Sequence, residues 1–283
     1  MTAFGLMTYS TKNLGDDIQS LAAKQFLPRV DHYVDRDHMS RSNELGDTHI
    51  ICNGWFMEPP YDWPPPSNIH PLFTSFHITE NRNAQKHLAN PSLKNYYKNY
   101  EPIGCRDTRT AQLLKDIGVE TKLTYCLSLA LKRPNVQRTE DVFIVDPYGP
   151  RRDWRLLIPH ALRNQATCLT HDTEETDWEV RFRRAEKLLQ MYARAKCVIT
   201  GRLHCALPCL AFGTPVLFIK RMNDPRIRDY LPMLHSCSMR ELFLNMMPFD
   251  WQNPPPNPVD VTPIRDNLLE EVSQCLPLVH FLP

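Results

Sequence analysis

Short apolar runs alternate along most of the chain with segments whose apolar residues recur at helical spacing. The stretch 197–219 shows the pattern most clearly. A strand beginning at Cys197 runs into a turn that carries Arg202 and His204, a short helix follows up to Gly213, and Val216–Ile219 forms a second strand. In an open α/β sheet such a turn faces the ligand crevice, and the helix N-terminus offers unpaired N–H groups to an anion. Arg202 and His204 are therefore candidate anion ligands.

The same alternation covers the rest of the chain. A strand near Phe4–Tyr9 precedes a helix that begins near Asp16 or Asp17, either of which can serve as its N-cap. Further strands are expected at 30–34, 49–52, 71–78, 103–105, 121–131, 142–145 and 167–170, and further helices at 108–118, 154–162, 178–195 and 261–276. In the helix 178–195, Arg181 falls outside the apolar stripe, which predicts a solvated position for it.

Two successive halves with this alternation predict an α/β protein of two Rossmann-like domains that face each other across a cleft. The charged, proline-containing stretch 132–140 reads as the linker between them. We therefore expect an N-terminal domain at residues 1–135, a C-terminal domain at residues 136–260, and a helix within residues 261–283 that packs back toward the first domain.

Polar residues gather where strands become helices in both halves. In the first half they are Asn53, His77 and Arg106, and Asp107 is a cap that can also hold Arg106. A lone strand histidine such as His77 is more often a core residue, so both readings stay open. In the second half, the basic loop after Ile219 adds Lys220 and Arg226 as further candidate anion contacts.

Composition narrows the classes of partner. The charges nearly cancel, with 33 Lys and Arg against 32 Asp and Glu, which argues against nucleic acid or an anionic membrane as the main partner. The nine cysteines lack paired metal spacing, so we expect reduced thiols and no metal centre. We find no secretory signal, and the longest apolar run, 205–219, is too short for a membrane span. We expect a cytoplasmic protein, with peripheral membrane association left open.

Three motifs in this order resemble those of the polysaccharide pyruvyltransferase family. They are Asn13–Asp16, Gly104–Asp107, and Thr200–His204 followed by a small-residue helix and Gly213–Val216. The resemblance covers most of the chain and implies the two-domain GT-B architecture. It also implies transfer of a pyruvyl group from phosphoenolpyruvate to two hydroxyls of a sugar, without a cofactor.

The resemblance also implies roles for individual residues. Arg106 and Arg202 look like the cations that bind the donor's phosphate and carboxylate, for which planar bidentate donors suit well. His204 looks like the general acid, because the methylene carbon of the donor needs a proton, and Asp16 is a candidate base toward the acceptor. The other expected donor-site residues are Asn13, Gly15, Asn53, His77, Leu203, Lys220 and Arg226. This mechanism requires Arg202 and His204 to face Arg106 closely enough to share one small anion.

Two other functions stay open at this point. A GT-B glycosyltransferase would hold a nucleotide-sugar diphosphate with Arg202, Lys220 and Arg226 at the same helix N-terminus. A catalytically silent carbohydrate-binding protein would retain the fold but not the activity. The acceptor is expected to be a sugar or glycan, free, nucleotide-linked or lipid-linked.

Overall fold

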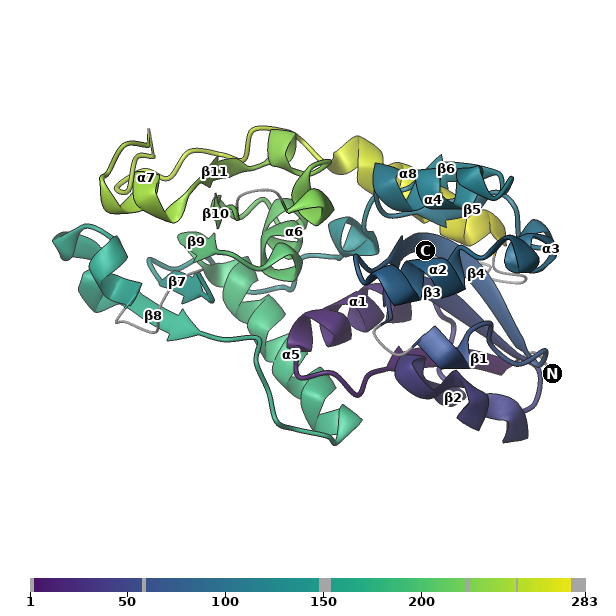
Figure 1. The fold of residues 1–283 in the computed structure, drawn as a ribbon. Coiled ribbons are helices and arrows are strands. Elements are labelled where there is room, and N and C mark those ends of the chain that lie inside the picture. Colours follow the sequence, from purple (N-terminus) through teal and green to yellow (C-terminus); the bar gives the residue numbers. More distant parts are fainter. Residues whose placement is uncertain (1–2, 58–59, 148–153, 222–223, 248, 276–283) are drawn as a thin grey trace. The chain divides into compact units, whose positions relative to one another are not determined.

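The computed structural model describes residues 3–57, 60–147, 154–221, 224–247 and 249–275. Residues 222–223 of the basic loop and residues 276–283 of the C-terminal segment lie outside these ranges. The chain divides into two compact units. Unit 1 comprises Met1–Thr11, Gln19–Ala130 and Ile264–Pro283, and unit 2 comprises Lys12–Ile18 and Leu131–Pro263. Each is a parallel α/β unit, as the alternating pattern predicted (Figure 1).

Unit 1 is built on a six-stranded parallel sheet with the order β2-β1-β3-β4-β5-β6. Its strands are β1 (Ala3–Thr8), β2 (His32–Asp35), β3 (Thr48–Phe56), β4 (Ile69–Ile78), β5 (Ile103–Cys105) and β6 (Thr121–Leu123). Its α-helices are α1 (Leu14–Lys24), α2 (Arg82–Leu88), α3 (Lys94–Lys98), α4 (Thr108–Asp116) and α8 (Thr262–Cys275), the first and last of which also contribute residues to unit 2. Its 3-10 helices are η1 (Arg36–Glu44), η2 (Pro60–Asp62), η3 (Pro91–Leu93) and η4 (Leu127–Ala130).

Aromatic side chains fill the core of unit 1 beside β3 and β4. Trp63 stacks on Phe76 and meets Phe56 edge-on, with ring centroids 5.6 and 5.2 Å apart. The indole N–H of Trp63 donates to the Tyr97 hydroxyl at 2.9 Å, and that hydroxyl donates to the Leu88 carbonyl at 2.7 Å. Because the polar edges of both rings are satisfied, the aromatic surfaces can be buried without an unpaired donor.

A β-bulge reshapes β4 just before its carboxyl end. Ser75 adopts φ = 58°, and the pairing register against β3 shifts between Cys52 and Gly54. The Ser75 N–H donates to Thr124 Oγ1 at 2.9 Å, which holds this uncommon conformation in place. A bulge re-aims the side chains that follow it, and His77 is among them.

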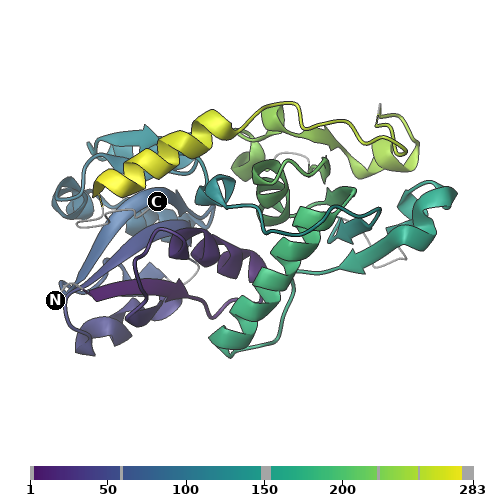
Figure 2. The same cartoon turned by 180° about the vertical axis from the view of Figure 1, so that it is seen from behind.

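Helix α8 covers part of unit 1 beside β5 and β6, as both ribbon views show (Figures 1 and 2). Lys122 of β6 pairs with Glu271 of α8 at 3.2 Å. Burial raises the pKa of Glu271, and the positive charge of Lys122 only partly offsets this rise.

Unit 2 is built on a five-stranded parallel sheet with the order β11-β10-β9-β7-β8. Its strands are β7 (Val142–Val145), β8 (Ala166–Leu169), β9 (Cys197–Thr200), β10 (Val216–Ile219) and β11 (His235–Cys237). Its α-helices are α5 (Trp178–Arg194), α6 (Leu203–Ala211) and α7 (Met239–Phe243), and its 3-10 helices are η5 (Trp154–Leu157), η6 (His160–Gln165), η7 (Pro225–Ile227) and η8 (Leu231–Met233). The predicted unit at 197–219 is confirmed as β9, α6 and β10.

Two predicted elements are wrong. The strand expected at 121–131 ends at Leu123, because Tyr125 adopts φ = 58° and the chain continues into η4. The helix expected at 154–162 is instead the pair η5 and η6. Pro159 lies between them, and a proline that lacks a backbone N–H and restricts its neighbour prevents one continuous α-helix.

The C-terminus of α6 is closed by a glycine and an arginine. Gly213 takes φ = 62°, which confirms its predicted role as the helix stop. Arg138, from the predicted linker, donates to the carbonyls of Ala195, Phe212 and Gly213 and to Thr214 Oγ1, at 2.7 to 3.0 Å. These bonds satisfy carbonyls that the end of the helix leaves free, and they seat α6 against the sheet.

Both sheets share one arrangement. In each, the first strand of the unit lies between the second and the third, so the connections run in opposite directions on either side of it. In parallel α/β sheets, ligands bind at the carboxyl ends of the strands where this reversal occurs. In unit 2 that place lies between β7 and β9. Across the described ranges, no helix is both long enough and apolar enough to cross a membrane.

Candidate functional site

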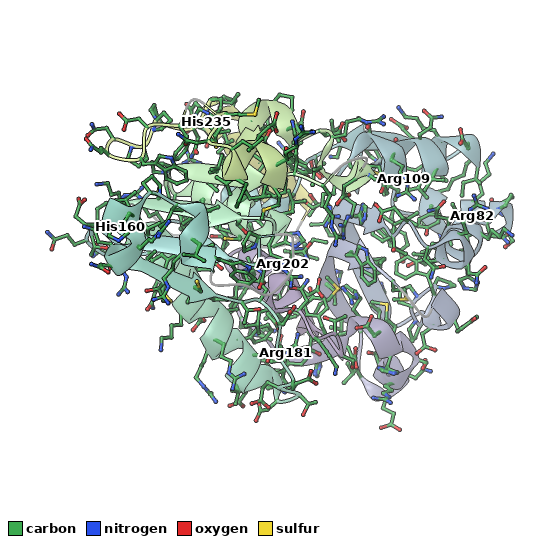
Figure 3. The ribbon with its side chains drawn as sticks, turned by 60° about the vertical axis from the view of Figure 1, so that its left-hand side comes forward. Arg82, Arg109, His160, Arg181, Arg202 and His235 are labelled. Atoms are coloured by element: carbon green, nitrogen blue, oxygen red, sulfur yellow. The ribbon has the colours of Figure 1, made fainter. Side chains whose placement is uncertain are left out.

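The reversal point of the unit 2 sheet carries what we call the switch-point site: Asp146, Asp172, Arg202, His204 and the turn Asn13–Gly15. Arg202 follows β9, and its N–H donates to Thr200 Oγ1 at 2.9 Å, while the Thr200 hydroxyl donates to the Val145 carbonyl at 2.9 Å. These two bonds tie the Arg202 turn to the adjacent strand β7. Arg202, labelled in Figure 3, is thereby held beside Asp146, the residue that follows β7.

The segment before α1 joins this site by backbone pairing. The Leu14 N–H donates to the His171 carbonyl at 2.9 Å, the Thr173 N–H donates to the Lys12 carbonyl at 3.0 Å, and Asn13 bridges Asp172 in antiparallel fashion. These antiparallel contacts place the first turn of α1 at the carboxyl edge of the unit 2 sheet. A sequence segment remote from β9 therefore contributes to the switch-point site.

Gly15 brings the first turns of α1 and α6 together. A Cβ added at Gly15 would lie 3.2 Å from the His204 Cβ and 3.1 Å from Asn13 Oδ1, so a larger residue would press on both. Asn13 Oδ1 accepts the Gly15 N–H at 3.0 Å, which makes Asn13 the side-chain cap of α1. The cap role predicted for Asp16 or Asp17 is therefore wrong. Asn13, Gly15, Leu203 and His204 lie together, at two adjacent helix N-termini.

Asp17 and Arg181 form a buried ion pair in unit 2. Arg181 Nη2 lies 2.8 Å from Asp17 Oδ2, and the two side chains are 2% and 1% exposed. The prediction of a solvated Arg181 is therefore wrong: α5 turns this arginine inward, where it also donates to the Glu175 carbonyl. Burial raises the pKa of Asp17 even though Arg181 opposes it. The neighbouring Asp16 is also buried, and its role as a base stays a prediction.

Two carboxylates bind the guanidinium of Arg202. Nε donates to Asp146 Oδ2 at 2.9 Å and Nη2 donates to Asp172 Oδ1 at 2.5 Å. Burial lowers the pKa of Arg202, but the two carboxylates outweigh it and raise the pKa above its ordinary value. Arg202 is thus permanently cationic and already carries two anionic partners. Its predicted contact with a donor anion stays a prediction.

The basic loop after β10 forms its charge pair within itself. Arg226 forms a bidentate pair with Asp224 of the same loop, at 2.7 and 2.9 Å. Burial raises the pKa of Asp224, but Arg226 outweighs this effect and holds it below its usual range. Lys220 directly follows β10, and its N–H donates to the Cys237 carbonyl of β11 at 2.9 Å. Anion binding by Lys220 and Arg226 stays a prediction.

A second polar cluster, the first-unit cluster, lies at the strand ends of unit 1. Its members are all essentially buried: Gln19, Asn53, His77, Arg106 and Asp107. Asn53 donates to the Gln19 carbonyl at 3.0 Å, and Arg106 donates to Gln19 Oε1 at 3.4 Å. The structure brings together three of the predicted site residues, Asn53, His77 and Arg106, whose role in a site stays a prediction. No sequence signal pointed to Gln19, which links Asn53 and Arg106.

The Asp107 carboxylate caps helix α4 and also contacts His77. Its Oδ1 accepts the Thr110 N–H at 2.8 Å, which confirms it as the cap of α4. Its Oδ2 lies 2.5 Å from His77 Nδ1 and 3.9 Å from Arg106 Nε. The closer partner of Asp107 is thus His77, which the sequence did not indicate because the two residues lie 30 positions apart.

The charge of His77 follows from its surroundings. Burial and the nearby Arg106 lower the pKa of His77 to about 4, against the opposing effect of Asp107. The imidazole is therefore neutral near pH 7, and donation from Nδ1 to Asp107 leaves Nε2 as an acceptor. Within the described residues, neither His77 Nε2 nor Asn53 Oδ1 has a hydrogen-bond partner. Two buried acceptors of this kind suit a hydroxyl donor better than an anion.

The described residues contain no group of three or more His, Cys, Asp or Glu side chains arranged to hold a metal ion. Arg106 belongs to unit 1, whereas Arg202 and His204 belong to unit 2. That these residues share one anion stays a prediction.

Comparison with solved structures finds similarity to two structures of the E. coli heptosyltransferase WaaC. The structure with ADP is 13% identical, with a TM-score of 0.38, over 97% of this chain and 100% of that chain. The structure with ADP-2-deoxy-2-fluoro heptose is 12% identical, with a TM-score of 0.30, over 97% and 99%. Comparison with curated proteins finds no match.

The family comparison covers most of the chain. Residues 13–223 match the model of the polysaccharide pyruvyl transferase family. The matched range begins at Asn13, the cap of α1, and includes both the first-unit cluster and the Arg202–His204 turn. The chain belongs to the polysaccharide pyruvyltransferase family, a family of transferases.

Proposed function

We propose that this transferase moves the pyruvyl group of phosphoenolpyruvate onto two hydroxyls of a sugar, within a glycan or a glycan precursor, and releases phosphate. The observation that carries the proposal is the meeting of the α1 and α6 N-termini at the switch-point site, where Gly15 lies against His204 beside Arg202. Each helix N-terminus directs the positive end of its dipole toward an anion bound there. Two such ends beside a guanidinium favour a ligand with more than one negative charge.

In this proposal the switch-point site binds the donor. Arg202 binds a carboxylate or phosphate in bidentate geometry, which a planar guanidinium does better than an ammonium. Leu203 and His204 lie in the first turn of α6, and Gly15 leaves the backbone close to the ligand because it has no side chain. Asn13 keeps that turn in place, while Lys220 and Arg226 are proposed as further cations toward the donor.

His204 is the proposed general acid. It gives a proton to the methylene carbon of phosphoenolpyruvate, while one sugar hydroxyl forms a bond to the adjacent carbon and loses its own proton to a base. The second hydroxyl then forms its bond to the same carbon as the carbon–oxygen bond to phosphate breaks. Of the two hydroxyl protons, one balances the proton added to the methylene carbon and the other leaves with phosphate. Asp16 is proposed as the base.

The first-unit cluster is proposed to position the part of unit 1 that contacts the acceptor, since its own side chains are buried. His77 Nε2 and Asn53 Oδ1 are acceptors that lack a described partner, so they are chemically suited to a buried hydroxyl donor. Asp107 sets the tautomer of His77 through Nδ1. Since phosphoenolpyruvate is made inside the cell, we expect the reaction to occur in the cytoplasm.

Ligand-induced stabilisation tests the donor. We expect phosphoenolpyruvate to raise the unfolding temperature, with the stabilisation reaching about 2.7 kcal/mol at 100 times its Kd, and expect equal concentrations of pyruvate or of nucleoside diphosphates to have little effect. Formation of a sugar ketal with stoichiometric release of phosphate completes the test. Stabilisation by nucleoside diphosphates alone would point to a glycosyltransferase, and stabilisation by sugars alone to a binding protein. Either result would overturn the proposal.

A further inference from the structure

The two carboxylates on Arg202 differ in how firmly they are held. Asp146 has a side chain that is 11% exposed, and its Oδ2 accepts both Arg202 Nε and the His171 N–H, at 2.9 and 2.8 Å. The His171 ring is itself anchored, since Nε2 lies 2.7 Å from the Tyr192 hydroxyl within the core. Asp146 is thus part of the framework of the switch-point site.

Asp172 is held differently. Its side chain is 54% exposed, and the carboxylate contacts Arg202 Nη2 at 2.5 Å. The backbone of Asp172 is tied down by the bridge to Asn13 and by donation of its N–H to Thr170 Oγ1. The carboxylate can therefore turn into water by side-chain rotation alone, while the backbone stays in place. An ion pair this exposed is weakly held, because water solvates both charges when the pair opens.

We infer that Asp172 is an exchangeable counter-ion that occupies the anion position on Arg202 and is displaced when an anionic ligand binds. A carboxylate on a guanidinium reproduces the contact that a ligand carboxylate or phosphate would make. With both Asp146 and Asp172 bound, two negative charges face one guanidinium, so a further anion is repelled. Departure of Asp172 leaves Arg202 balanced by Asp146 and opens its Nη2 to the ligand.

The naming of phosphoenolpyruvate as that ligand rests on the proposed function, whereas the exchange itself does not. Phosphoenolpyruvate carries a carboxylate and a phosphate, so one group can take the place of Asp172 on Arg202 while the other faces the helix N-termini. Asp172 acts in this scheme as a specificity-determining residue, because an anion that gains too little from the site cannot displace it. Inorganic phosphate is a probe of the exchange that does not depend on the donor.

The variant Asp172→Asn tests the inference through the affinity for inorganic phosphate, measured by calorimetry at fixed ionic strength. Loss of the competing carboxylate is expected to tighten phosphate binding about fivefold to tenfold, and phosphoenolpyruvate binding in the same direction. Glu174→Gln is the matched control: it removes the same charge two residues away, from a side chain that pairs with Lys12 and is 82% exposed. Its phosphate affinity is expected to stay within about twofold of wild type.

The outcomes separate this inference from the proposed function. Tighter phosphate binding in Asp172→Asn, with no phosphoenolpyruvate binding in any variant, would support the exchange and refute the donor. Unchanged or weaker phosphate binding in Asp172→Asn would overturn the exchange and make Asp172 a brace that orients Arg202. An equal gain in Glu174→Gln would also overturn it, because the effect would then be general charge removal. Unfolding curves of both variants check that each is folded.

Discussion

The two polar clusters occupy corresponding ends of two similar sheets, yet one is sealed and the other is open. In unit 1, His77, Arg106 and Asp107 are at most 1% exposed. In unit 2, the side chains of Arg202 and Asp172 are 30% and 54% exposed. Both clusters combine an arginine with an aspartate at a strand-to-helix turn, so the strand order and residue types alone do not distinguish them.

The difference in burial determines whether Arg106 or Arg202 can exchange a protein partner for a ligand. A buried ionic group depends on its protein partners, because water is not there to replace them, and losing one partner leaves an uncompensated charge. An exposed pair opens at little cost and can exchange one partner for a ligand. We therefore assign a fixed, positioning environment to the first-unit cluster and an exchanging one to the switch-point site. Four variants, beginning with the one of greatest expected effect, test this division.

The largest effect is expected at the Asp17–Arg181 ion pair of unit 2, which is buried like the first-unit cluster. Arg181→Met leaves Asp17 charged, buried and unpaired, so the free energy of unfolding should fall by about 3 to 5 kcal/mol in urea denaturation. Arg183→Met on the same helix is the matched control. Its pair with Glu179 is exposed, and a change within about 0.5 kcal/mol is expected. Equal losses in the two variants would remove the distinction between sealed and exposed pairs.

The open cluster should show its effect in activity. Arg202→Ala removes the guanidinium from the switch-point site, and kcat/KM for phosphoenolpyruvate should fall about 100- to 1,000-fold in a phosphate-release assay. Arg202→Lys should recover only part of the loss, since an ammonium keeps the charge without the planar fork. Near-normal affinity for phosphoenolpyruvate in Arg202→Ala would contradict the assignment of this residue to the donor.

The sealed cluster should show its effect in the pH dependence of stability. The pKa of His77 is about 4 when folded, against 6.5 as the ordinary value. Below pH 6.5 the unfolded chain takes up a proton at this residue that the folded protein does not, so the free energy of unfolding should fall as the pH drops from 6.5 to 4, by about 3 kcal/mol in total.

His77→Gln removes this contribution, because glutamine does not titrate. Urea denaturation of both proteins between pH 7 and pH 4 should therefore give a shallower pH dependence for the variant. Parallel curves would show that His77 is solvated and titrates normally, and the first-unit cluster would not be sealed.

The smallest effect is expected at His204, and it concerns chemistry rather than binding. His204→Gln keeps a polar side chain at the first turn of α6 but removes the proton donor. We expect kcat to fall about 100-fold while the Kd for phosphoenolpyruvate changes little. Turnover measured under saturating donor and calorimetry on the same preparation separate the two quantities. Unchanged turnover would mean that the proton comes from another group.

Local features were predictable from the sequence because local physics produces them. Strand–helix–strand alternation at 197–219, the cap at Asp107 and the helix stop at Gly213 each depend on residues within one or two turns. The failures at 121–131 and 154–162 are also local. An apolar run does not reveal a positive φ at Tyr125. The apolar pattern at 154–162 predicts one continuous helix, but Pro159 interrupts it and leaves η5 and η6.

Partners far apart in the sequence were not predictable. Arg181 sits on a helix face that looks polar, and its burial follows from an aspartate 164 positions earlier. The two carboxylates on Arg202 lie 56 and 30 positions before it. No periodicity connects such residues, because only the order of strands in the sheet decides which turns become neighbours.

Residue patterns alone were enough to predict the parallel α/β class, the turn that presents Arg202 and His204, and the family motifs. These follow from hydrophobic periodicity, turn chemistry and residue spacing, which act over short stretches of chain. Three-dimensional packing was needed to show that Gly15 lies against His204, that Asp107 pairs with His77, and that Arg202 carries one buried and one exposed carboxylate. The physical reason is that burial and charge pairing are set by the packing of distant segments, and it is burial that separates a fixed arginine from an exchangeable one.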